Sequence, residues 1–352
     1  MGITNQSVGL LTSGSLVAGG YIPPITGTYY HVCPGTSTFS NAQGRQIVGS
    51  SGNDGLSLNS PLDSLATAYG MCTSGAGDGI ILWSYGLTTS ACSSYLTTPL
   101  TWSKHGITCA GVCAPTAYDQ RARVANASSA INLASLITLS GNNNILLNMS
   151  TGNFGTASTA LGGVIVSGQR NYLGNVGIIG AGSTTPAQTT GANSLTLSGA
   201  DGNTFYNCTI GTDTVDQDGS QAVTGVIKFI GTSGGAAQNN QKNLFDRCRI
   251  LSYISYANST SGQIHLVGSG DALDRDQEFR DCSFINFKLG APMTTPPAAL
   301  VVGTAPTNGC INLTGNTYMK GFAAYAAASF GRVFVTGPAA NAAGGLSVVT
   351  PS

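Results

Sequence analysis

Three stretches of this 352-residue chain, NTFYNCTI at residues 203–210, NLFDRCRI at 243–250 and QEFRDCSF at 277–284, repeat the pattern Phe-x-x-Cys-x-(Ile/Phe). The intervals between their Phe residues are 40 and 34 residues, so the pattern returns while the loops vary in length. Each stretch follows a second apolar run that ends in glycine: SLTLSG, VIKFIG and QIHLVG. A repeated unit of strand, turn, loop and strand predicts a solenoid, in which each coil stacks on its neighbours.

Stacking of these units predicts an inward ladder of equivalent side chains. In a regular strand, Phe and Cys three positions apart point to opposite faces, so the pattern also predicts a bend between them. The corners of a β-helix supply such bends. A sandwich or barrel of many short strands is the competing interpretation. The predicted ladder consists of Phe205, Cys208, Ile210, Phe245, Cys248, Ile250, Phe279, Cys282 and Phe284.

The composition favours strands over helices. Charged residues make up 8% of the chain, Glu278 is the sole glutamate and 49 residues are glycine, whereas exposed helices are usually rich in Glu, Lys and Arg. The formal net charge is zero and no basic stripe is present, which argues against nucleic acid as a partner. No apolar run approaches the ~20 residues of a membrane span, so no membrane partner is predicted. The nine cysteines are predicted to be free, buried thiols.

A short helix is predicted near the N-terminal end of the solenoid. Ser60 is a favourable N-cap residue and Pro61 suits the first helical position. Apolar residues then recur with helical spacing from Leu62 to Tyr69, which predicts a capping helix over residues 61–70.

The stretch SGNDGLSLNSPLDSLATAYG at residues 51–70, followed by GDGIILWSYG at 77–86 and then by strand–turn coils, resembles a known group of proteins. It is similar to the right-handed parallel β-helix, or pectin-lyase-like, structural proteins of tailed bacteriophages. The resemblance covers residues 49 to about 320. The matching residues are Gly49, Ser50, Asn53, Asp54, Gly55, Ser57, Pro61, Ser64, Leu65, Gly77, Asp78 and Ile80.

The resemblance implies an all-β, right-handed parallel β-helix with a short N-terminal capping helix. It also implies a virion protein, assembled in the host cytoplasm, that decorates the capsid, forms a head fibre or belongs to the tail, and that forms a homotrimer. Residues 1–45 are predicted to be an arm that anchors the chain to the major capsid protein or another virion protein. Residues 46–321 would form the β-helix, and the Gly/Ala-rich residues 322–352 would close its end.

Two acidic clusters are the candidates for catalysis, because glycoside hydrolysis needs two carboxylates facing one groove. The motifs of polygalacturonases and pectate lyases are absent, and Asp alternates with Arg in the second cluster, as in self-neutralising surface pairs. We therefore predict solvated loops, no catalytic residue, no metal, no cofactor and no enzymatic activity. The candidate carboxylates are Asp213, Asp216 and Asp218 in the first cluster and Asp271, Asp274 and Asp276 in the second.

Two alternatives to a purely structural role stay open. One is a tailspike-type depolymerase of a host polysaccharide; the other is a non-catalytic adhesin that binds a host glycan through residues such as Tyr253 and Tyr256. A zinc site is not predicted at His105, Cys109 and Cys113, because four residues of a strand span about 13 Å, too far for one metal ion.

Overall fold

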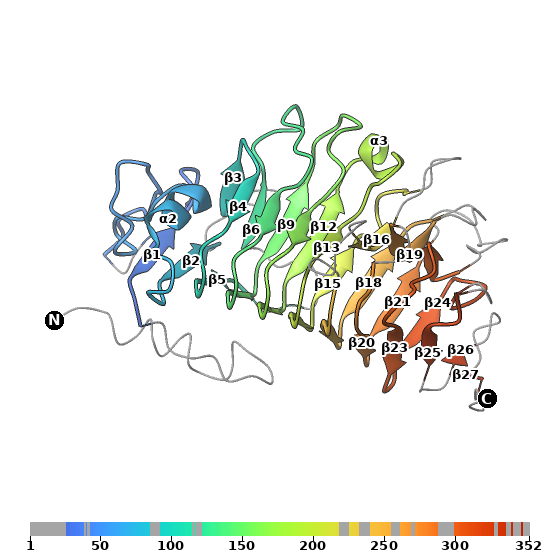
Figure 1. Ribbon diagram of the computed structural model, residues 1–352. Helices are drawn as coiled ribbons and strands as arrows, with labels where there is room; N and C mark the ends of the chain where they lie inside the picture. The colour runs from blue at the N-terminus through green and yellow to red at the C-terminus, as the bar shows by residue number, and fades with distance from the viewer. Residues whose placement is uncertain are drawn as a thin grey trace.

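The computed structural model describes residues 26–38, 40, 43–84, 92–114, 116, 122–217, 225–231, 240–254, 261–268, 272–287, 299–326, 330–335, 339–340 and 346–347. Three parallel sheets dominate these residues, and each full coil of chain contributes one strand to each sheet. Figure 1 shows the coils following one another along a single direction, from the end that carries α2 to the end that carries β25. The protein is a right-handed parallel β-helix, as the sequence predicted, and the sandwich and barrel interpretations are wrong.

The largest sheet has ten strands, and its order follows the order of the coils. Its strands are β1 (Tyr29–Val32), β2 (Gly79–Trp83), β5 (Thr108–Val112), β8 (Ile145–Leu147), β11 (Tyr172–Gly174), β14 (Thr204–Tyr206), β17 (Leu244–Asp246), β20 (Gln277–Arg280), β23 (Ile311–Thr314) and β25 (Val333–Val335).

The other two walls have seven and eight strands. The seven-stranded sheet contains β4 (Leu100–Trp102), β7 (Ile137–Leu139), β10 (Val164–Val166), β13 (Leu195–Ser198), β16 (Gly225–Ile230), β19 (Gly262–Val267) and β22 (Val301–Gly303). The eight-stranded sheet contains β3 (Ser94–Leu96), β6 (Arg123–Asn126), β9 (Ser150–Asn153), β12 (Gly177–Ala181), β15 (Thr209–Gly211), β18 (Arg249–Ser252), β21 (Ser283–Asn286) and β24 (Tyr318–Lys320). An antiparallel pair, β26 (Ala339–Ala340) and β27 (Leu346–Ser347), lies beyond β25 in the chain.

The phenylalanines of the repeated pattern form a column inside the solenoid. Phe205, Phe245 and Phe279 are directly opposite one another in adjacent strands and are all fully buried. Their ring centroids are 4.5 and 4.4 Å apart, and both pairs are stacked within 8° of parallel. The column is part of one continuous hydrophobic core. Every second side chain along a strand points inward, so each coil contributes apolar residues to this core.

A left-handed residue makes the bend that brings the cysteines to the same side as the phenylalanines. Asn207, Arg247 and Asp281 stand between Phe and Cys in the three units, with φ angles of 50°, 55° and 53°. Such a residue turns the chain sharply from the ten-stranded into the eight-stranded sheet. Cys248 and Cys282 are therefore buried, and each thiol donates a hydrogen bond of 3.2 Å to the carbonyl of the Phe one coil below. All nine cysteines are free and buried, as predicted.

A second column, which the sequence analysis missed, consists of buried amides at the corner before the ten-stranded sheet. Successive side chains bond to one another at distances of 2.9–3.2 Å, with each Nδ2 donating to the side-chain oxygen of the next coil. The same oxygens accept backbone N–H groups, so the corner of each coil has its polar groups satisfied without water. The column consists of Asn144, Asn171, Asn203, Asn243 and Gln277.

The N-terminal cap contains the predicted helix, but four residues later than expected. Helix α2 is Leu65–Met71, and its N-cap is Ser64, whose hydroxyl accepts from the Thr67 N–H at 3.4 Å. The predicted start at Pro61 is wrong because Leu62 is extended and bonds to strand β1 on both sides, through its N–H and its carbonyl. Pairing with the first strand outweighs the local preference of the Ser60-Pro61 pair for a helix start.

Several of the matching residues between positions 49 and 80 build this cap. Asp78 accepts two backbone N–H groups at 2.6 Å, from Thr28 and Thr73, and so ties β1 to the end of α2. The Asn53 side chain donates to the Pro61 carbonyl at 2.7 Å. At Gly49 a Cβ atom would lie 1.5 Å from a backbone oxygen, so no other residue fits there. The motif is explained by the closure of the solenoid end.

The stack of strands is longer than the predicted domain of residues 46–321. It begins at β1, inside the segment predicted to be an arm, and extends to β25, inside the predicted closing segment. Of the predicted anchoring arm, residues 1–45, residues 1–25 lie outside the described part of the chain, and the anchoring role of the arm stays a prediction. Among the described residues, no helix has the length and hydropathy needed to cross a membrane.

Candidate functional site

One row of residues on the outer face of the eight-stranded sheet combines two arginines with three small residues. Arg123, Ser150, Gly177, Thr209 and Arg249 are directly opposite one another in five successive strands. The next residue along each strand points inward instead, as Ile178 and Ile210 do. The small residues leave space beside Arg123, although Ser150 and Thr209 are themselves buried.

A pocket of about 380 Å³ occupies this space. We call it the trough, because its lining residues come from five successive coils and it therefore extends along the solenoid axis. It is lined by Arg123, Ser150, Phe154, Gly177, Ile179, Gly182, Thr209, Gly211, Thr212, Asp213, Thr214, Val215 and Leu251.

Phe154 forms an aromatic wall of the trough, and two glycines make room for its ring. A Cβ atom at Gly152 would lie 2.7 Å from the ring, and one at Gly182 would lie 2.4 Å from it. The backbone N–H of Phe154 donates to the side chain of Asn126 at 2.6 Å, which fixes the start of the loop after β9. The Arg123 guanidinium lies 6.0 Å from the centre of the ring, within range of a cation–π contact. The trough thus presents an apolar ring beside a positive charge.

Asp213 supplies the carboxylate of the trough from the loop that follows β15. This loop turns at once, because the Thr212 hydroxyl accepts the Thr214 N–H at 3.2 Å and lies 2.9 Å from the Thr214 hydroxyl. Further on, the N–H of Gln217 donates to the Tyr253 carbonyl at 2.8 Å, which anchors the loop to the next coil. Asp213 is therefore held at the rim of the trough, and Arg123 belongs to the same lining.

The other candidate carboxylates do not converge with Asp213. Asp216 lies on the same loop but does not line the trough, and Asp218 lies outside the described residues. The second cluster lies at a different corner, between the seven-stranded and ten-stranded sheets. There Asp274 pairs with Arg275 at 3.3 Å and Asp276 accepts from the Cys310 thiol at 3.0 Å, while Asp271 is outside the described residues.

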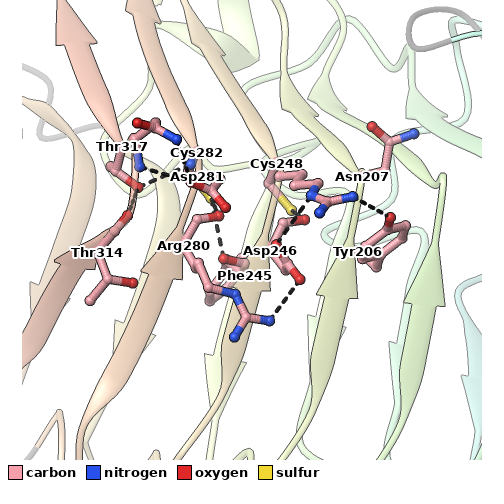
Figure 2. Close-up of polar contacts among 12 residues, drawn as sticks. Tyr206, Asn207, Phe245, Asp246, Cys248, Arg280, Asp281, Cys282, Thr314 and Thr317 are labelled. Carbon is pink, nitrogen blue, oxygen red and sulfur yellow. Dashed lines mark hydrogen bonds and ion pairs between the residues drawn. The ribbon is translucent and has the colours of Figure 1, made fainter. Parts of the chain in front are cut away.

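A polar row on the outer face of the ten-stranded sheet is the most highly charged described surface of the later coils. Figure 2 shows its side chains reaching across neighbouring strands. Arg280 donates to the Asp246 carboxylate at 2.8 Å, and Arg247 donates to the Tyr206 hydroxyl at 3.0 Å. Interaction with Asp246 raises the pKa of Arg280. Thr314 donates to Glu278 at 2.9 Å. These groups neutralise one another, so the row ties adjacent coils together.

Two titratable residues lie side by side on the outer face of the seven-stranded sheet. Lys228 and His265 are directly opposite each other in β16 and β19, and both are half-buried. Burial lowers the pKa of Lys228, and burial together with the Lys228 charge lowers the pKa of His265 to about 4. The imidazole is therefore neutral near pH 7.

The described residues contain no group of three His, Cys, Asp or Glu side chains that could hold a metal ion. His105 is exposed and its Nδ1 accepts the Asn142 N–H at 2.9 Å, whereas Cys109 and Cys113 are buried. Of the two tyrosines proposed for an adhesin, Tyr253 is half-buried and Tyr256 lies outside the described residues.

The fold is similar to that of solved carbohydrate-active enzymes. A pectate lyase structure matches with a TM-score of 0.54 and 15% sequence identity, over 87% of this chain and 66% of the lyase. This chain thus spans slightly less than two thirds of the lyase. A rhamnogalacturonan lyase matches with a TM-score of 0.48 and 14% identity, over 84% of this chain and 68% of the other. No family model and no curated protein matches the sequence.

These comparisons correct the prediction that the chain is not an enzyme. That prediction rested on the absence of known catalytic motifs and on the alternation of Asp with Arg; it was wrong because the pectate lyase shows that the same fold carries an enzyme. At 15% identity the likeness shows the fold alone, so the function of this chain has to be argued from its own residues.

The sequence analysis identified Asp213 but missed Arg123, Phe154 and Arg249. Arg123 and Phe154 belong to no motif, and Arg249 occupies a variable position of the repeated stretch at residues 243–250. The register of the coils is the signal that relates them, since Arg123 and Arg249 occupy equivalent positions four strands apart. That register cannot be counted from the sequence because the loops differ in length from coil to coil.

Proposed function

We propose that this protein is a polysaccharide depolymerase that binds an acidic glycan in the trough and cleaves it. The observation that carries the proposal is the lining of the trough, which combines Phe154, Arg123 and Asp213 with Gly, Ser and Thr residues and with three aliphatic side chains. An aromatic ring offers a face on which a sugar can stack, and a guanidinium binds a carboxylate with two parallel hydrogen bonds. Acidic sugars match this combination of an apolar wall and a positive charge.

The lining favours elimination over hydrolysis. Hydrolysis of a glycosidic bond uses two carboxyl groups, and Asp213 is the one carboxylate among the described residues that line the trough. In elimination, a proton leaves the carbon beside the uronate carboxylate, a carbon–carbon double bond forms, and the bond to the neighbouring sugar oxygen breaks. That oxygen keeps the electron pair of the broken bond and takes a proton from water to leave as a hydroxyl group. Arg123 would neutralise the uronate carboxylate, and Asp213 would accept the proton.

Location on a virion belongs to the same proposal. Its support is the sequence resemblance over residues 49–80. Between Arg123 and Asp201 the sole charged residue is Arg170, and such a tract suits contacts between copies of a homotrimer. A particle-bound depolymerase would combine this location with cleavage of a host glycan. Deletion of residues 1–25 tests the anchor, because the described solenoid is then retained while incorporation into particles should be lost.

The activity is tested with the full chain and a panel of glycans that includes pectate, rhamnogalacturonan, other uronic-acid polymers and neutral controls. Elimination releases products that absorb ultraviolet light through their new double bond, whereas hydrolysis releases reducing ends without that absorbance. Asp213→Asn and Arg123→Gln should each lower the rate at least about 100-fold. Asp274→Asn is the matched control and should leave the rate unchanged, since Asp274 lies at another corner. Absence of cleavage across the acidic glycans would overturn the proposal.

A further inference from the structure

Three aliphatic side chains of the trough, those of Ile179, Val215 and Leu251, have no role in the proposed binding of a uronate. Aliphatic groups neither donate to nor accept from the hydroxyl groups that surround a sugar ring. A hydroxyl pressed against them would lose its water without gaining a partner, which weakens binding. These side chains therefore indicate a ligand that carries a small apolar group in addition to its charge.

Two of the three side chains flank a glycine on the outer face of the eight-stranded sheet. Gly211 in β15 is directly opposite Leu251 in β18. On its other side, the pairing of Ile178 with Ile210 places Ile179 of β12 next to Gly211. Gly211 has a φ angle of 93°, and a Cβ atom there would lie 2.0 Å from the Leu251 carbonyl oxygen, so no other residue fits. The missing side chain leaves a notch, which we define by Ile179, Gly211 and Leu251.

The notch has room for one methyl-sized group. Strands β12, β15 and β18 follow one another in the sheet (Figure 1). Neighbouring strands are about 4.8 Å apart, so β12 and β18 are separated by about 9.6 Å, and carbon atoms in contact lie about 4 Å apart. One small group therefore fills the space between Ile179 and Leu251. Ile179 and Val215 are half-buried and Leu251 is buried, and all three line the trough, so the notch opens into it.

Two threonine hydroxyls that follow Gly211 in the chain have a proton to donate. The Thr212 Oγ1 lies 2.9 Å from the Thr214 Oγ1 and accepts the Thr214 N–H at 3.2 Å. The contact between the two hydroxyls uses one of their two protons, whichever of them donates. Neither hydroxyl has another acceptor among the residues that the structure describes, and both threonines line the trough. The second proton can therefore be donated to a ligand in the trough.

We propose that the notch binds an acetyl group carried by the acidic glycan. The inference rests on the proposed function, because it takes the trough as the place where the glycan binds. The acetyl methyl group fills the notch, and the acetyl carbonyl oxygen accepts the remaining proton of the Thr212–Thr214 pair. A free sugar hydroxyl in the same place would face Ile179 and Leu251 without a partner, and a longer acyl chain would exceed the space. The protein thus selects acetylated over unsubstituted uronate polymers.

The test measures dissociation constants by calorimetry for three forms of polygalacturonate: chemically O-acetylated, the same preparation after removal of the esters with mild alkali, and O-propionylated. The full chain carries Asp213→Asn in every sample, so that cleavage does not change the ligand. The acetylated form should bind about tenfold or more tightly than either of the others, which is the usual effect of one small group that fits an apolar pocket. Ile179→Thr combined with Val215→Thr should remove this preference by weakening the acetylated form about tenfold, while the de-esterified form binds as before.

Hyaluronate, in which glucuronate alternates with N-acetylglucosamine, distinguishes the two sources of an acetyl group. Binding of hyaluronate that is lost in the double variant would assign an amide to the notch as well as an ester. Failure of hyaluronate to bind, beside tight binding of the acetylated polygalacturonate, would assign the ester alone.

Ile285→Thr is the matched control, because Ile285 is opposite Leu251 on the next strand of the same sheet and does not line the trough. It should leave the preference for the acetylated form unchanged. Circular dichroism and thermal unfolding of each variant check that the fold is retained. If the acetylated and de-esterified forms bind equally, or if the double variant keeps the preference, the acetyl site is refuted while the trough site stands. If the Asp213→Asn chain binds none of the polymers, the proposed function fails together with this inference.

Discussion

Truncation of a phenylalanine to alanine should lower the free energy of unfolding by different amounts at different positions in the column. Phe245 is fully buried, with stacked rings at 4.5 Å on one side and 4.4 Å on the other and the edge of Phe229 at 6.5 Å. Truncation of a buried Phe to Ala costs about 3–5 kcal/mol. Phe245→Ala also removes two stacked pairs, whereas Phe205→Ala removes one, so Phe245→Ala should be the more destabilising by about 1 kcal/mol.

The assay is urea unfolding at equilibrium, followed by circular dichroism and by fluorescence. A solenoid can unfold in parts, so agreement of the two probes is needed before free energies of unfolding are compared. Tyr318→Ala is the control, because Tyr318 is 42% exposed and its loss should cost within about 0.5 kcal/mol. The reasoning is refuted if Phe205→Ala costs as much as Phe245→Ala, or if Phe245→Ala costs less than about 2 kcal/mol.

Three further predictions concern the polar groups. Asn203→Leu should lower the free energy of unfolding by about 2 kcal/mol or more, although the two side chains have similar volumes, because buried partners in adjacent coils lose their hydrogen bonds. Urea unfolding measures this change, and an unchanged free energy would contradict the prediction. Burial lowers the pKa of His31 to about 4, and its Nδ1 accepts the Trp83 N–H at 2.9 Å, so the unfolded chain binds more protons between pH 4 and 6.5. His31 should thus lower the free energy of unfolding by up to about 3 kcal/mol as pH drops from 6.5 towards 4. The pKa of His265 is also lowered to about 4, so His31→Asn, which keeps an acceptor, should remove only the part of the pH dependence that comes from His31. Arg280→Met should cost about 0.5–1 kcal/mol at low ionic strength and less in high salt, because its pair with Asp246 is partly exposed; a cost that does not depend on salt would contradict this.

The sequence predicted the fold because the repeated pattern carries its own geometry. Phe and Cys can share a face only if a bend separates them, and the residue between them proved to be left-handed at all three positions. Asn207 is a common residue in that conformation, but Arg247 is not, so the bend was deduced from the pattern and not from local preference. The amide column was missed because its four asparagines lie at the corners between strands, where Asn is expected for other reasons.

The trough was harder to predict from the sequence because it depends on missing side chains. Gly152 and Gly182 matter through the absence of a side chain, which lets the Phe154 ring lie over the backbone, and a single glycine in a chain with 49 of them carries no signal. The acidic clusters attracted attention because charge is rare in this sequence, yet in the second cluster Asp274 pairs with Arg275 and Asp276 accepts from the Cys310 thiol, away from the trough. A site on a solenoid is a property of the register between coils. The register that places Arg123 and Arg249 in one row can be assigned only when the length of every intervening loop is known. The sequence around each residue does not contain that information.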